Sequence, residues 1–152
     1  MTTKQRRQYL TLYAVQSLIE TMWEDKKEWQ SKTRKQLKRI KQDVSDMISG
    51  YGDPTVSDWM VFKRAANRLS FGWSEHDGSK HGPAAFVCIA ITLVADQVSL
   101  IPKKAKYTRA PFERLEGMLA TLYRHFDPDY EDGVSSMQGE AVAKEYRFLV
   151  AG

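Results

Sequence analysis

The residues best suited to metal chemistry lie in the segment SEHDGSKHG, where His76, Asp77 and His81 fall within six positions. Imidazole and carboxylate groups are ligands that zinc and other divalent ions accept, and His125 or Asp127 could add a third ligand. Two histidines in a glycine-containing loop lack the one-turn geometry of helical hydrolase sites, and no companion Cys or Glu motif follows. We therefore predict no metal ion and no other cofactor, and keep a metal-dependent enzyme around His76 and His81 as the second alternative.

Other catalytic arrangements have weaker support. Ser74 and Ser79 stand beside the same histidines, but the chain has no Gly-x-Ser-x-Gly motif and no glycine-rich phosphate loop. The segment DPDYEDG begins like a calcium-binding loop. Asp132 stands where that loop needs glycine, however, and Gln138 stands where it needs a bidentate glutamate. We therefore predict that the protein is not an enzyme.

Charge is the most informative functional feature of the sequence. The 152 residues carry 23 Lys and Arg against 19 Asp and Glu, a formal net charge of +4. Residues 1–110 hold 19 basic and 11 acidic side chains, whereas residues 111–152 hold 4 basic and 8 acidic side chains. A body of charge +8 therefore precedes a region of charge −4, and such segregation favours a polyanionic partner.

Three basic segments are the candidate nucleic-acid-binding residues. They comprise Lys32, Arg34, Lys35, Lys38, Arg39 and Lys41, then Lys63, Arg64, Asn67 and Arg68, and then Lys103, Lys104, Lys106 and Arg109. The cations would engage phosphates, and Asn67 could read a base edge. Exposed helix faces are commonly charged for solubility alone. We nevertheless predict a binding protein for DNA or RNA, with docking of the basic face to an acidic protein partner as the alternative.

The elements that would position these residues are helical. Apolar residues recur at helical spacing from position 12 to position 47, and Gly50 follows as a C-terminal cap. This pattern predicts one long amphipathic helix over residues 1–49, or two collinear helices. A continuous helix of about 70 Å exceeds what a domain of this size can cover, so we expect a homo-oligomer or a bound partner along it. The predicted interface residues are Leu12, Val15, Ile19, Met22, Trp23 and Trp29.

The remaining residues, 51–152, predict a compact helical body. We expect helices over 56–70, 84–100, 112–126 and 135–149. The second of these segments is rich in β-branched residues and could form a buried strand, but the chain offers no second strand to pair with it. The sequence therefore predicts a single all-α domain, 1–152, of about five helices.

Cysteine usage and hydropathy indicate the compartment. A lone cysteine, Cys88, cannot form an intramolecular disulfide, which fits a reducing environment. The longest apolar run, from Ala84 to Val94, is too short for a membrane span. We therefore predict a soluble cytoplasmic protein that does not contact a membrane.

Overall fold

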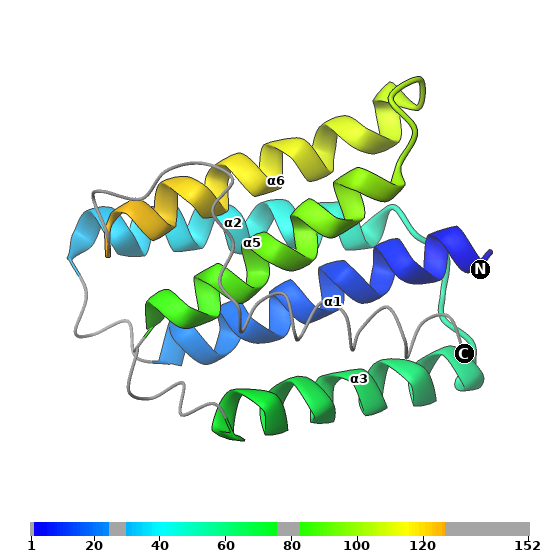
Figure 1. Ribbon diagram of the computed structural model, residues 1–152, viewed down its shortest axis with the longest axis horizontal. Coiled ribbons are helices and arrows are strands. Elements are labelled where there is room, and N and C mark those ends of the chain that lie inside the picture. Colours follow the sequence, from blue (N-terminus) through cyan, green and yellow to red (C-terminus); the bar gives the residue numbers. More distant parts are fainter. Residues whose placement is uncertain (1, 25–29, 76–82, 127–152) are drawn as a thin grey trace.

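The predicted all-α class is confirmed. The computed structural model describes residues 2–24, 30–75 and 83–126, and within these ranges the chain forms helices and no strand (Figure 1). The helices are α1 (Thr3–Glu24), α2 (Ser31–Ser49), α3 (Val56–Glu75), α5 (Pro83–Leu100) and α6 (Lys106–Arg124). The segment that could have been a buried strand is α5, and Pro83 occupies its first position.

Four of these helices form an antiparallel bundle. Around it, α1 packs against α2, α2 against α6, α6 against α5, and α5 against α1. Each of these neighbours runs antiparallel to the next (Figure 1). The helix α3 lies outside this ring, runs parallel to α1 and packs against it.

The first fifty residues differ from the prediction of one continuous helix or two collinear helices. The helix α1 ends at Glu24, and α2 begins at Ser31 and returns alongside α1. Helical spacing does not distinguish a straight helix from two helices that turn their apolar stripes toward each other. The folded-back arrangement is favoured because each stripe then removes the other from water.

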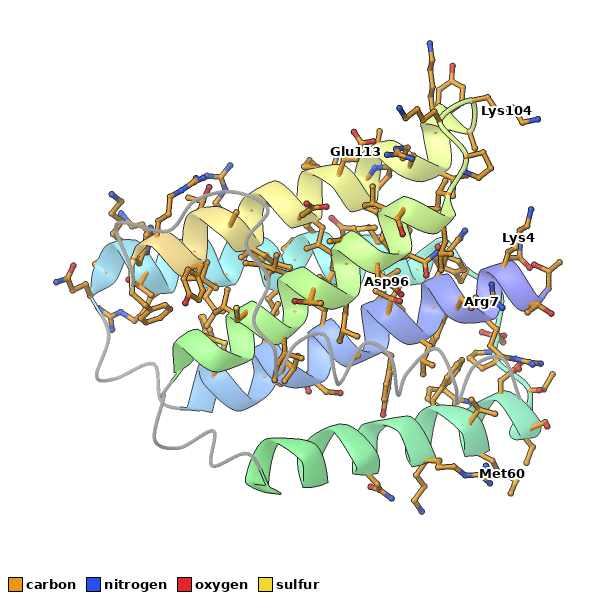
Figure 2. All side chains as sticks on the ribbon, viewed as in Figure 1. Lys4, Arg7, Met60, Asp96, Lys104 and Glu113 are labelled. Atoms are coloured by element: carbon orange, nitrogen blue, oxygen red, sulfur yellow. The ribbon has the colours of Figure 1, made fainter. Side chains whose placement is uncertain are left out.

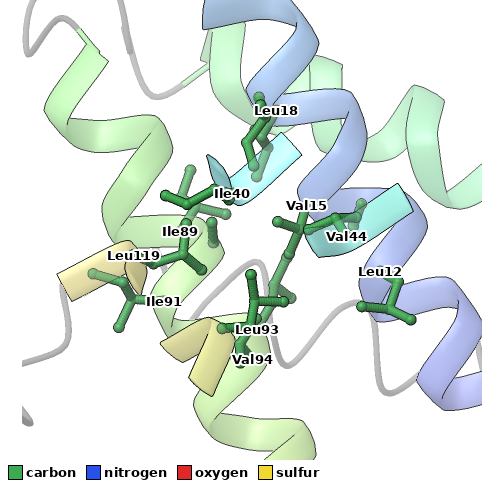
Figure 3. Packing of buried hydrophobic residues seen from close by; sticks show 14 of the residues in the cluster. Leu12, Val15, Leu18, Ile40, Val44, Ile89, Ile91, Leu93, Val94 and Leu119 are labelled. Carbon is green, nitrogen blue, oxygen red and sulfur yellow. The ribbon is translucent and has the colours of Figure 1, made fainter. Parts of the chain in front are cut away.

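The core surrounds α1 on several sides. Its buried residues are Tyr9, Leu10, Thr11, Leu12, Ala14, Val15, Leu18, Ile19 and Met22. Figure 3 shows Leu12 and Val15 of α1 close to Val44 of α2, with Leu93 and Val94 of α5 on the other side of this cluster. A helix buried this widely needs more than one covering neighbour, and α2, α5 and α3 supply the cover.

Polar contacts attach the start of α3 to α1. The buried Asp58 accepts a hydrogen bond from Arg6 Nε at 2.8 Å and another from the Thr55 backbone N–H at 2.9 Å. The Asp58 N–H donates in turn to Thr55 Oγ1 at 3.1 Å, which completes a capping box. The Thr55 N–H is the main cause that holds the pKa of Asp58 below its usual value despite burial. Phe62, which is also buried, stacks on Tyr9 with ring centroids 4.8 Å apart.

Two helix boundaries differ from the prediction. The helix α6 begins at Lys106 and not near residue 112, so Pro111 lies inside it rather than in its first turn. Arg109 Nη1 donates to the Ile101 carbonyl at 2.7 Å and the Ala105 N–H donates to the Pro102 carbonyl at 3.0 Å, which stabilises an earlier start. The helix α3 continues to Glu75, five residues past the predicted end at residue 70. The helix predicted over 135–149 lies outside the described residues.

Truncation of the α2 core stripe should destabilise the bundle. Leu37 is fully buried, and we expect Leu37→Ala to lower the free energy of unfolding by about 2–5 kcal/mol because it leaves a cavity. The matched control is Lys38→Ala at the neighbouring exposed position, which should change stability by no more than about 0.5 kcal/mol. Urea unfolding followed by circular dichroism measures both, and equal effects of the two substitutions would contradict this packing.

Candidate nucleic-acid interface

The three predicted basic segments lie on different parts of the molecule. All the basic residues of α2 except Lys41 lie in its first half, beside the end of α6, because these two helices are antiparallel. The α5–α6 connector lies at the opposite end of the bundle, where Lys104 projects (Figure 2). The helix α3, marked by Met60, lies along another edge, against α1 (Figure 2). The segments therefore do not form one continuous surface.

The largest group of cations lies on α2. We define the α2 basic face as Lys32, Arg34, Lys35, Lys38, Arg39 and Lys41. All of these side chains are exposed except Lys41, which is half-buried. The face lies opposite the buried stripe of Thr33, Leu37, Ile40 and Val44, as helical spacing requires. No ion pair within the described residues neutralises any of its cations.

One edge of the α2 basic face meets α1. Lys41 Nζ lies 5.1 Å from the centre of the Trp23 ring, a cation–π contact. Trp23 is half-buried and packs against the core. This contact fixes the position of one cation on the face and covers the tryptophan ring that we had expected at a partner interface.

The other edge meets α6 through polar side chains. Gln36 Nε2 donates to the Met118 carbonyl at 3.1 Å, and Arg114 Nη2 donates to Asp43 Oδ1 at 3.1 Å. Arg114 thus engages Asp43, and no ion pair in the described part of the chain joins this carboxylate to an α2 cation. The second acidic residue of α2, Asp46, accepts a hydrogen bond from Gln42. The acidic groups of α2 therefore lie in its second half, and the first half keeps its positive charge.

His125 lies at the same contact between α2 and α6, near the start of α2. Its Nδ1 lies 3.0 Å from the hydroxyl oxygen of the buried Thr33. Burial lowers the pKa of His125, and the neighbouring Lys32 cation lowers this pKa further. Both effects make this imidazole harder to protonate than that of a free histidine.

The basic groups on α3 and in the connector are smaller. On α3, Lys63, Arg64 and Asn67 are exposed, whereas the side chain of Arg68 lies outside the described part of the chain. At the other end of the bundle, the exposed cations are Lys103, Lys104 and Lys106. Arg109 instead bonds Glu113 and the Ile101 carbonyl, so its charge is used within the protein.

The predicted partner interface on the N-terminal helix is covered by the protein itself. Leu12, Val15, Ile19 and Met22 are all buried in the core, and Trp29 lies outside the described residues. The expectation of a partner assumed an uncovered helix, a condition that this fold does not meet. A second protein could reach these four residues only if the bundle opened.

The residues considered as candidate metal ligands lie almost entirely outside the described residues. This holds for His76, Asp77, His81 and Asp127, whereas His125 contacts Thr33 as described above. Within residues 2–24, 30–75 and 83–126, no three His, Cys, Asp or Glu side chains are grouped as metal ligands would be. The helices of these same ranges include none with the length and apolarity needed to cross a membrane.

The lowered pKa of His125 predicts a pH-dependent stability. The pKa of His125 is lower in the folded protein than in the unfolded chain, where it is about 6.5. The unfolded chain therefore takes up the proton first, and stability should fall as the pH drops from about 7.5 to 5.5. His125→Gln keeps a hydrogen-bonding partner for Thr33 and should reduce this dependence.

Urea midpoints of the parent and of His125→Gln across this pH range measure the effect. The other two histidines are present in both proteins, so the difference between them isolates His125. Parallel pH profiles would contradict the assignment.

The α2 basic face is thus the strongest candidate for binding a polyanion. It combines exposed cations, a rigid helical support and the absence of acidic partners among the described residues. Comparisons of the chain with protein-family models, curated proteins and solved structures gave no match.

Proposed function

We propose that the protein is a non-enzymatic nucleic-acid-binding protein whose α2 basic face contacts the phosphate backbone. The observation that carries the proposal is the set of exposed cations on one side of α2 without acidic partners in the described structure. Lysine and arginine on a helix face bind phosphates without requiring a particular base sequence. The proposal therefore concerns affinity for the backbone, and the α2 basic face is given no role in reading bases.

The dimensions of the face support this proposal. Lys32 and Lys41 are nine residues apart, which corresponds to about 14 Å along a helix. A nucleic-acid duplex presents one phosphate charge for about every 1.7 Å of its axis. Several cations of the face can therefore contact phosphates at the same time, and each contact releases condensed counterions from the nucleic acid.

The structure changes which residues the proposal includes. Lys63, Arg64 and Asn67 on α3 and the cations of the connector lie away from α2, so they are left out of this surface. Self-association through α1 is also left out, because its apolar side chains are buried. A cytoplasmic location is part of the proposal, since Cys88 is a free thiol and nucleic acid is available there.

Charge reversal on α2 tests the proposal directly. Fluorescence anisotropy with labelled duplex DNA, single-stranded DNA and RNA should show binding that weakens as salt is raised. We expect Lys38→Glu with Arg39→Glu to weaken binding to every sequence. For duplex DNA, the slope of log K against log salt should become about 1.8 units shallower, because two phosphate contacts are lost.

The matched control is Lys103→Glu with Lys104→Glu in the α5–α6 connector, away from both the α2 basic face and α3. Both double variants change the net charge by the same amount, and all four positions are exposed. The control should therefore keep nearly the affinity and salt slope of the parent. Equal losses in both variants would assign the binding to overall charge and would overturn the role of α2.

Absence of binding to all three polymers at low salt would overturn the proposal as a whole. The alternative partner, an acidic protein, makes a different prediction for the same samples. In that case polyglutamate would bind the parent and would lose affinity with the α2 double variant, whereas nucleic acid would not bind.

A further inference from the structure

Three large apolar side chains are exposed together at the start of α3. Val56 is 80% exposed, Met60 is 62% exposed and Trp59 is 46% exposed. Val56 and Met60 lie one helical turn apart, and Trp59 adjoins them on the same side of the helix. We call these three residues the α3 patch. Single exposed apolar residues are ordinary, whereas a contiguous group on one helix face marks a contact surface.

The α3 patch is held rigidly. The Trp59 ring makes edge contacts with Tyr9, Tyr13 and Phe62, at centroid distances of 6.5, 6.2 and 5.7 Å. The helix beneath it is fixed at its start by the Asp58 capping box and the ion pair with Arg6. Tryptophan is a frequent anchor of protein interfaces, and a fixed anchor loses little conformational entropy on binding.

Charges at the two ends of the patch are opposite in sign. Asp53 precedes the patch and Lys63 follows it, and both side chains are exposed. Neither has an ion-pair partner among the described residues. The order along the chain is therefore acidic, apolar and basic. In a second copy that runs in the opposite direction, the basic end meets the acidic end of the first copy, and the two apolar parts meet each other.

We propose that the α3 patch binds the same patch of a second copy of the chain, with the two α3 helices antiparallel about a two-fold axis. In an antiparallel pair centred between Val56 and Met60, Val56 of each copy faces Met60 of the other. The same symmetry brings Lys63 of each copy toward Asp53 of the other. The pairing therefore buries the apolar side chains and matches both charges.

The dimer is weak and reversible. Three side chains supply much less than the roughly 800 Å² per partner of a stable interface. The α2 basic face takes no part in this contact, because α3 lies outside the four-helix ring and packs against α1. Dimerisation therefore goes beyond the proposed function, and either property can fail without the other.

A charge swap tests the antiparallel geometry. Sedimentation equilibrium of the full chain over a wide concentration range should show a monomer–dimer equilibrium for the parent. Asp53→Lys alone and Lys63→Asp alone each place like charges together at two symmetric positions, and each should raise the dimer Kd about tenfold. The combined variant Asp53→Lys with Lys63→Asp restores opposite charges and should return the Kd close to that of the parent.

A second pair of variants separates the patch from general surface effects. Met60→Asp places a carboxylate within the apolar contact and should leave a monomer at all concentrations. Tyr107→Asp is the matched control, because Tyr107 is 98% exposed at the start of α6, and it should dimerise like the parent. Circular dichroism melting checks that each variant is folded.

Three results would overturn the proposal. They are a parent that stays monomeric throughout, a charge swap that remains as weak as the single variants, and a parent that grows beyond a dimer. The first would mean that the patch does not bind a second copy, and the last would mean that the contact is not two-fold symmetric.

Discussion

Burial of α1 is the constraint on which the rest of the structure depends. Its buried side chains include Tyr9, Val15 and Leu18 and extend over more than one side of the helix. A single partner helix could not cover all of them, and α2, α5 and α3 each pack against α1. Once α1 is enclosed, the outer side of α2 has nothing left to cover. That side is where the exposed cations lie, so the candidate site is a consequence of how the core is built.

The helical class and the division of α2 into two sides could be predicted from the sequence. Leu37, Ile40 and Val44 recur at helical spacing, and they are buried while Lys38 and Arg39 between them are exposed. The direction of the chain after α1 could not be predicted in this way. Periodicity reports which side of a helix is apolar, and it is equally satisfied when the stripe meets another helix or continues in a straight line. The choice depends on contacts with α5 and α6, which are distant in sequence.

The charge map was harder to predict for a related reason. The sequence shows the order of the charges along the chain, whereas binding depends on where these charges lie in three dimensions. Arg109 illustrates the difference, because it stabilises the start of α6 through the Ile101 carbonyl and is not a free cation. The same bond explains why the helix begins before Pro111. A proline usually marks the first turn of a helix, but tertiary contacts can extend the helix ahead of it.

The contrast between Phe62 and Trp59 shows that an apolar residue type does not by itself predict burial. Both are large apolar residues of α3, three positions apart, yet Phe62 is fully buried against Tyr9 and Trp59 is 46% exposed. Because α3 covers only one side of α1 and lies outside the four-helix ring, its apolar side is wider than the surface available to bury it. The excess remains exposed beside Lys63 and Asp53. An outer helix with more apolar surface than its own core can cover is a source of self-association, whereas a central helix such as α1 is not, however apolar its sequence.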